Sequence, residues 1–140
     1  MSRTKEQRAW DALRDKNLGR LLLKRVENTA GDPLADVIGQ NRKGRAFWLE
    51  LKAIDKWPAR ATTQPLRGKF EPGQIPFAKE WNYWGGFAFV LLRVGVTEWF
   101  LLWPRDPRQP EIVDMTSQEI RTWCAASGLH NIIEFLESIE

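Results

Sequence analysis

The sequence is poor in the residues that build disulfides and zinc sites. Its 140 residues include one cysteine, Cys124, and one histidine, His130. A single cysteine excludes an internal disulfide. With only one histidine in addition, the chain has too few Cys and His ligands for a typical zinc site. We expect Cys124 to be a small buried residue on a helix.

Long apolar runs, internal repeats, low-complexity tracts and glycine-rich phosphate loops are also absent from the sequence. No stretch is apolar enough to cross a membrane, and no signal peptide opens the chain. We therefore expect one soluble domain over 1–140, in the cytoplasm or, for a viral chain, inside the host cell. Its core is predicted over about 4–103, followed by a helical part at 115–139.

Charge is divided unequally along the chain. Residues 1–69 carry sixteen Lys or Arg and eight Asp or Glu, whereas residues 70–140 carry five and ten. A basic half favours contact with a phosphate backbone, although exposed basic residues also occur on ordinary surfaces. The predicted DNA contacts are Arg3, Lys5, Lys24, Arg25, Lys56, Arg60, Arg67 and Lys69.

A β-hairpin is predicted over 34–40 and 45–53, two short segments rich in apolar residues, with a polar turn between them. A three-residue loop that ends in a left-handed Gly44 would pair Asp36 directly with Glu50. An even loop without a bulge would instead place the two carboxylates on opposite faces.

Glu50 and Lys52 share one face because side chains alternate along a strand. With Asp36 opposite Glu50, two carboxylates and an ammonium gather there. The carboxylates suit a hard cation such as Mg²⁺, with Mn²⁺ as a substitute, and Lys52 can hold a phosphate or orient an attacking water. The alternative is a structural ion-pair cluster, because an acid two residues before a lysine is common by chance.

Asp36 in LADVIG, followed after thirteen residues by Glu50-Leu51-Lys52, resembles the PD-(D/E)xK nuclease superfamily. The small size, the segment FEPGQIPFAKEW and the following GGFAFVLLRV are similar to Holliday junction resolvases of the archaeal Hjc and bacterial RecU type. The resemblance covers residues 4–103. It departs from the family pattern at Ala35, where the family name has proline.

The resemblance implies a restriction-endonuclease-like α/β fold, with a mixed sheet of about five strands flanked by helices. It implies magnesium-dependent cleavage of four-way DNA junctions by a homodimer, with Asp36, Glu50 and Lys52 at the catalytic centre. It also implies an acid on the first helix and a polar residue at Gln74. The alternatives are another nuclease of the superfamily, acting on flaps, ends or recognition sequences, and a catalytically silent DNA-binding module.

Residues 4–16 predict an amphipathic helix capped by Thr4, with Leu13 on its core side. Glu6 lies on the same side, which fits a third carboxylate that leans over the site and helps to bind metal. The alternative is a first-turn glutamate favoured by the helix dipole, and Asp11 is a further candidate for the helix carboxylate.

A strand is predicted over 20–27, and Asp32 lies in the loop that follows, as a turn residue or a supporting residue of the site. The segment 54–69 has no clear period and is predicted to form a loop at the mouth of the site. A helix over 72–84 places Gln74 in its first turn, where the side chain can reach the site or only cap backbone groups.

Two apolar strands are predicted over 87–94 and 97–103. The first should run parallel to the strand of Glu50, because the helix between them supplies the crossover. A capping box at Thr116 to Glu119 predicts a helix over 116–126, and a last helix is expected at 131–139. Their broad apolar surface, with Trp99 and Trp103, predicts a dimer interface.

Overall fold

The computed structural model describes residues 4–26 and 34–140, and within them one mixed sheet has six strands in chain order. The strands are β1 (Leu22–Arg25), β2 (Val37–Gln40), β3 (Ala46–Ile54), β4 (Ala88–Val94), β5 (Glu98–Leu102) and β6 (Ala126–Ser127). The α-helices are α1 (Lys5–Asn17), α2 (Gln74–Tyr83), α3 (Ser117–Trp123) and α4 (Leu129–Ser138). The α/β class with a mixed, helix-flanked sheet is confirmed, with one strand more than predicted.

Strands β3 and β4 are parallel neighbours, whereas the other neighbouring pairs are antiparallel. Parallel neighbours need a long crossover, and α2 lies in that crossover as predicted. Across the described residues, no helix is long and apolar enough to cross a membrane.

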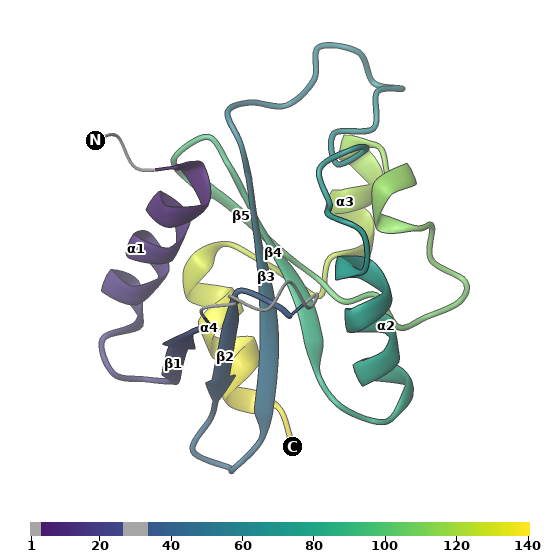
Figure 1. Cartoon of the computed structure of the whole chain (residues 1–140). Helices are drawn as coiled ribbons and strands as arrows, with labels where there is room; N and C mark the ends of the chain where they lie inside the picture. The colour runs from purple at the N-terminus through teal and green to yellow at the C-terminus, as the bar shows by residue number, and fades with distance from the viewer. Residues whose placement is uncertain (1–3, 27–33) are drawn as a thin grey trace.

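The sheet separates two cores. Leu49 and Leu51 of β3 point into the first core, together with residues of α1 and α4. The second core lies on the other face, under α2, α3 and the irregular segment 55–70. Figure 1 shows α1 and α4 on one side of the sheet and α2 and α3 on the other. The face of β3 opposite Leu49 and Leu51 therefore looks toward α2.

Helix α1 begins as the sequence predicts. Thr4 is its N-cap, and a capping box joins the Thr4 side chain to the Gln7 N–H at 3.1 Å and the Gln7 side chain to the Thr4 N–H at 2.9 Å. The helix ends where Leu18 takes the left-handed conformation, with φ of 48°. Ala9 and Leu13 are buried against the sheet, so α1 is fixed along its core side.

The hairpin of β2 and β3 has the predicted register. Gly44 has φ of 81°, and the loop is closed by hydrogen bonds between Asn41 and Gly44 and between Asn41 and Arg45. The ladder pairs Gln40 with Ala46 and Val37 with Leu49. Its continuation by one residue sets Asp36 opposite Glu50, which confirms the predicted geometry.

The C-terminal prediction is wrong in detail. Helix α3 ends at Trp123 rather than at Ala126, because the chain turns there to hydrogen-bond the edge of β5 as β6. The Ala125 N–H donates to the Leu101 carbonyl at 2.8 Å. Cys124 is therefore a half-buried C-cap and not a buried helical residue.

The apolar surface predicted around Trp99 and Trp103 is used within the chain. Trp99 is 4% exposed in the first core, and Trp103 packs between Phe89 and Phe135, with ring centroids at 5.1 and 6.0 Å. Trp99 is therefore buried within the chain, whereas Trp103 stays half-buried and its place in an interface stays a prediction. Among the described residues, the exposed aromatic side chains include Trp81, Tyr83 and Trp84 at the end of α2, and Trp123 at the end of α3.

Candidate active site

The candidate site lies where β3 extends beyond β2. The pairing of β2 with β3 ends at Val37 and Leu49, so β3 continues past its neighbour. The Asp36 carboxylate takes the next position along this edge and accepts a hydrogen bond of 2.8 Å from the Leu51 N–H. One oxygen of Asp36 is thereby fixed against the backbone of β3, next to Glu50.

Glu50 and Lys52 are buried charged residues on the α2 side of β3. They are 5% and 8% exposed, and the Lys52 Nζ lies 3.7 Å from the Glu50 Oε2. Burial of a charged group costs several kcal/mol unless charges and hydrogen bonds compensate it. The alternation of β3 thus creates a charged cluster inside the protein.

Gln74, the first residue of α2, bridges this pair. Its Nε2 donates to the Glu50 Oε2 at 3.1 Å, and its Oε1 accepts from the Lys52 Nζ at 3.0 Å. The same Oε1 accepts from the Glu71 N–H at 2.9 Å. Gln74 therefore does both things the sequence left open: it reaches the site and it caps the backbone.

Phe70 completes the surroundings of Lys52, and sequence reasoning missed it. The Lys52 Nζ lies 4.7 Å from the centroid of the Phe70 ring, within the range of a cation–π contact. Phe70 packs against the second core. Its place four residues before Gln74 was the only available signal, because both residues lead into the same helix.

The electrostatics of Glu50 separate this cluster from an ordinary ion pair. Burial raises the pKa of Glu50 to about 9, and hydrogen bonding to Asp36 and its charge add to this rise, while Lys52 acts in the opposite direction. One ammonium thus does not compensate two carboxyl groups. The oxygen donors and the shortage of positive charge fit a hard divalent cation, for which Asp36 and Glu50 would be ligands.

Glu6, the carboxylate predicted on the first helix, is less closely connected to the cluster of Asp36, Glu50 and Lys52. Glu6 is half-buried in the first turn of α1, whose core side packs with Leu49 and Leu51 on the face of β3 opposite Glu50. Among residues 4–26 and 34–140, no group of three or more His, Cys, Asp or Glu side chains could hold a metal ion. The role of Glu6 stays a prediction.

Asp11 and Asp32 were the other acidic residues predicted as candidates near the site. Asp11 forms an ion pair of 3.6 Å with Arg14 on the same helix. Asp32 lies outside the described residues. Asp11 therefore already has a cationic partner on its own helix.

Most of the basic residues predicted to contact DNA are exposed. Lys24, Lys56, Arg60 and Lys69 are exposed, and Arg3 lies outside the described residues. Three others have partners: Lys5 pairs with Asp55 at 3.0 Å, Arg67 pairs with Asp114, and Arg25 lies over the Trp10 ring. The segment after Ile54 is irregular as predicted, and Figure 1 shows it rising above the sheet toward α3.

Comparison with known proteins connects the fold to solved structures. No protein-family model matches the chain, and no curated protein matches it significantly. The chain is similar to the structure of Hjc from Archaeoglobus fulgidus, a Holliday junction resolvase from an archaeal hyperthermophile. The TM-score is 0.56 at 14% identity, over 91% of this chain and 96% of that one. The likeness shows that the chain has the fold of that resolvase.

Proposed function

We propose that this protein is a metal-dependent, structure-selective DNA endonuclease, a Holliday junction resolvase that cuts phosphodiester bonds symmetrically as a homodimer. The observation that carries the proposal is the buried carboxyl pair of Asp36 and Glu50 beside Lys52, joined by Gln74. This cluster lies in a chain with the fold of an archaeal resolvase. Each part supports the other, because fold alone does not determine function.

Asp36 and Glu50 would hold Mg²⁺, or Mn²⁺ in its place, with Glu6 as a further carboxylate. When bound, such an ion polarises a phosphate oxygen and lowers the pKa of a bound water. Lys52 is held by Gln74 at 3.0 Å, so its ammonium has a defined position for a phosphate oxygen or for the attacking water. Gln74 holds the side chains of Lys52 and Glu50 next to each other through its two hydrogen bonds.

A structural ion-pair cluster explains the site less well. In such a cluster the ammonium would favour the ionised carboxylate, whereas burial and Asp36 raise the pKa of Glu50 to about 9. A catalytically silent DNA-binding module would have no need to bury these groups. Metal-dependent cleavage by the purified chain separates this alternative from any nuclease.

The homodimer follows from the substrate. A four-way junction must be nicked in two strands related by its own two-fold symmetry, whereas the chain has one such cluster in its sequence. The exposed Trp81, Tyr83 and Trp84 provide apolar surface for a second copy. Light scattering at micromolar concentration should give about twice 16.3 kDa, and Trp84→Ser should shift it toward the monomer. A chain that stays monomeric on junction DNA would contradict the resolvase proposal and leave a generic nuclease.

The test of substrate class is a cleavage assay on a four-way junction, a flap and a linear duplex of matched sequence, with Mg²⁺, Mn²⁺ or EDTA. We expect paired nicks near the branch point of the junction and little cutting of the duplex. Equal cutting of all three substrates would support a less selective nuclease. No cutting of any substrate by a folded chain would contradict the nuclease proposal.

A further inference from the structure

A cavity of about 310 Å³ lies at the far end of β3, away from the Asp36 carboxylate. Three basic side chains from two elements line it: Lys5 and Arg8 of α1, and Arg93 of β4. One acidic residue, Asp55, also lines it. The lining therefore carries a net charge of +2, in a hollow formed where the first turn of α1 meets the ends of two strands.

Arg93 is held in a fixed position in this cavity. Its Nε and Nη2 donate to the Val96 carbonyl at 3.3 and 3.1 Å, and its guanidinium lies 5.2 Å from the centroid of the Trp99 ring. A guanidinium has five N–H donors, so these two bonds leave donors for a further acceptor. A planar fork of this kind suits a phosphate oxygen.

Lys5 can turn to a ligand at small cost. It pairs with Asp55 at 3.0 Å, and the two side chains are 47% and 77% exposed. Exposed ion pairs of this kind stabilise a fold by about 0–1 kcal/mol. An anion in the cavity would therefore compete well with Asp55 for the ammonium.

The cavity also lies at a useful distance from the carboxyl pair. Arg93 pairs with Ala53, three residues along β3 from Glu50, and Asp55 is five residues along. At about 3.3 Å per residue, the cavity lies about 10–16 Å from Glu50 as measured along the axis of β3. One strand of DNA carries a phosphate about every 3.4 Å of helix axis and also winds around that axis, so this span corresponds to a few nucleotides at most.

We propose that this cavity binds a backbone phosphate of the DNA strand, a few nucleotides from the bond that is cut. The inference rests on the proposed nuclease function and adds Arg8 and Arg93 to its DNA-binding surface. The sequence concealed Arg93, because it lies within an apolar strand of the acidic half of the chain. A phosphate contact would position the DNA without reading its sequence.

The test compares Arg8→Gln and Arg93→Gln with Lys16→Gln, which removes the same charge from an exposed residue of α1 eight positions from Arg8. Affinity for a four-way junction is measured by fluorescence anisotropy in EDTA, so that no DNA is cut. Each cavity variant should bind about three- to tenfold more weakly, with the slope of log Kd against log salt lowered by about one. Lys16→Gln should change affinity by less than about twofold.

A second arm locates the phosphate. Single methylphosphonate linkages, which are neutral, are placed at successive positions along the strand. The wild-type chain should lose affinity when the neutral linkage is at one position, a few nucleotides from the cut. In Arg8→Gln, the neutral linkage at that position should lower affinity little further, because the contact is already lost. Arg8 is exposed, so this variant keeps the test valid even if Arg93→Gln fails to fold.

Cavity variants that bind like Lys16→Gln, while the wild-type chain cuts junctions, would overturn the phosphate site alone. A wild-type chain that neither binds nor cuts DNA would overturn the proposed function. The two failures are therefore distinguishable.

Discussion

The two faces of β3 are buried to a similar degree and are built for different purposes. Leu49 and Leu51 are 0% and 1% exposed and pack in the first core under α1 and α4. Glu50 and Lys52, at 5% and 8%, are buried on the other face with Gln74 as their bridge. One strand thus has an apolar face whose burial stabilises the fold and a charged face whose burial costs free energy.

The two faces of β3 differ in what they contribute to the stability of the fold. Apolar burial contributes favourably to stability, whereas buried charged groups are often replaceable by apolar residues without loss of stability. The charged face of β3 is therefore better explained by chemistry than by folding. Substitutions on the two faces should have opposite effects on stability and on activity.

The largest expected stability effect is on the apolar face. Leu51→Ala should lower the free energy of unfolding by about 3 kcal/mol, because it leaves a cavity in the first core. Urea denaturation measures this loss. Leu51→Met, which conserves volume, should cost less than about 1.5 kcal/mol. A Leu51→Ala variant of full stability would contradict the assignment of this face.

On the charged face, Lys52→Ala should lower the cleavage rate about 10²-fold or more without unfolding the chain, because Lys52 is the only cation that Gln74 positions within the described site. Single-turnover cleavage with saturating enzyme measures the chemical step. Lys56→Ala removes an exposed lysine nearby and should weaken binding without changing that step. Equal effects of the two substitutions would remove Lys52 from the catalytic centre.

Glu50→Gln should stabilise the metal-free chain at pH 8 by about 1 kcal/mol or more. The folded-state pKa of Glu50 is raised from 4.5 to about 9, so between these values the folded chain keeps a proton that the unfolded chain has lost. The contribution of Glu50 to stability is therefore full below pH 4.5 and falls as pH rises toward 9. Thermal unfolding in EDTA should show a gap between wild type and variant that widens with pH. A constant gap would contradict the burial of the carboxyl pair.

The smallest expected effect concerns the turn that sets the register of the two faces. Gly44→Val should cost about 1 kcal/mol or more, because a β-branched residue resists φ of 81°. Space is not the reason, since a Cβ at Gly44 would meet nothing within 4 Å. Gly44→Asn, which tolerates the left-handed conformation, is the matched control in thermal unfolding. Equal losses in both variants would refute the conformational explanation.

Local signals predicted the parts of the fold that depend on local chemistry. Thr4 caps α1 as expected, Thr116 opens α3 with the expected capping box, and Gly44 closes the loop that sets the register of β2 against β3. Parallel neighbouring strands need a long connection between them. The segment with the helix at Gln74 is long enough, so the parallel pairing of β3 and β4 could be predicted. The main residues of the candidate site could be predicted because Asp36, Glu50 and Lys52 lie on one hairpin. Gln74 lies at the start of the next helix.

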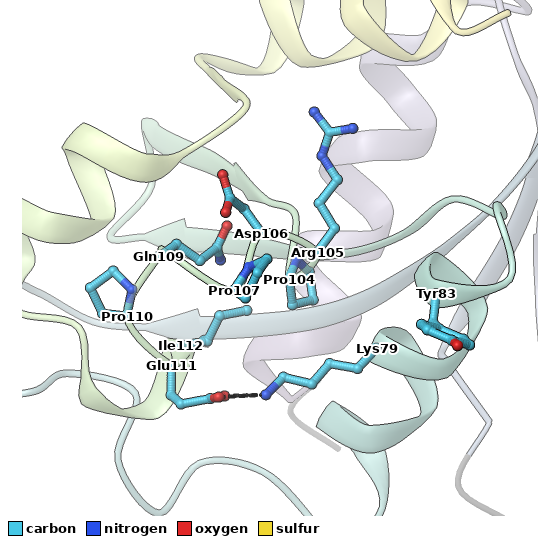
Figure 2. A pocket seen from close by; sticks show the side chains of 10 residues that line it. All are labelled: Lys79, Tyr83, Pro104, Arg105, Asp106, Pro107, Gln109, Pro110, Glu111 and Ile112. Carbon is cyan, nitrogen blue, oxygen red and sulfur yellow. Dashed lines mark hydrogen bonds and ion pairs between the residues drawn. The ribbon is translucent and has the colours of Figure 1, made fainter.

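The parts that were missed depend on distant contacts. Strand β6 exists because the edge of β5 offers hydrogen bonds, which no pattern around Ala126 shows. Trp103 is packed because Phe135 reaches it from α4. Figure 2 shows another such case: the Lys79 side chain of α2 meets Glu111 beside a proline-rich segment that includes Pro107. Long-range packing of this kind decides which apolar residues remain exposed, among them Trp81, Tyr83 and Trp84 at the end of α2.

In the proposed function, the charged face of β3 cuts DNA with the help of a metal ion. The most direct measurement is the cleavage of a four-way junction with Mg²⁺ by Asp36→Asn and Glu50→Gln, with affinity measured in parallel. We predict that each variant loses cleavage by about 10³-fold or more, because each loses a metal ligand, and that both still bind the junction through Lys and Arg residues elsewhere. Cleavage retained by either variant would contradict the claim.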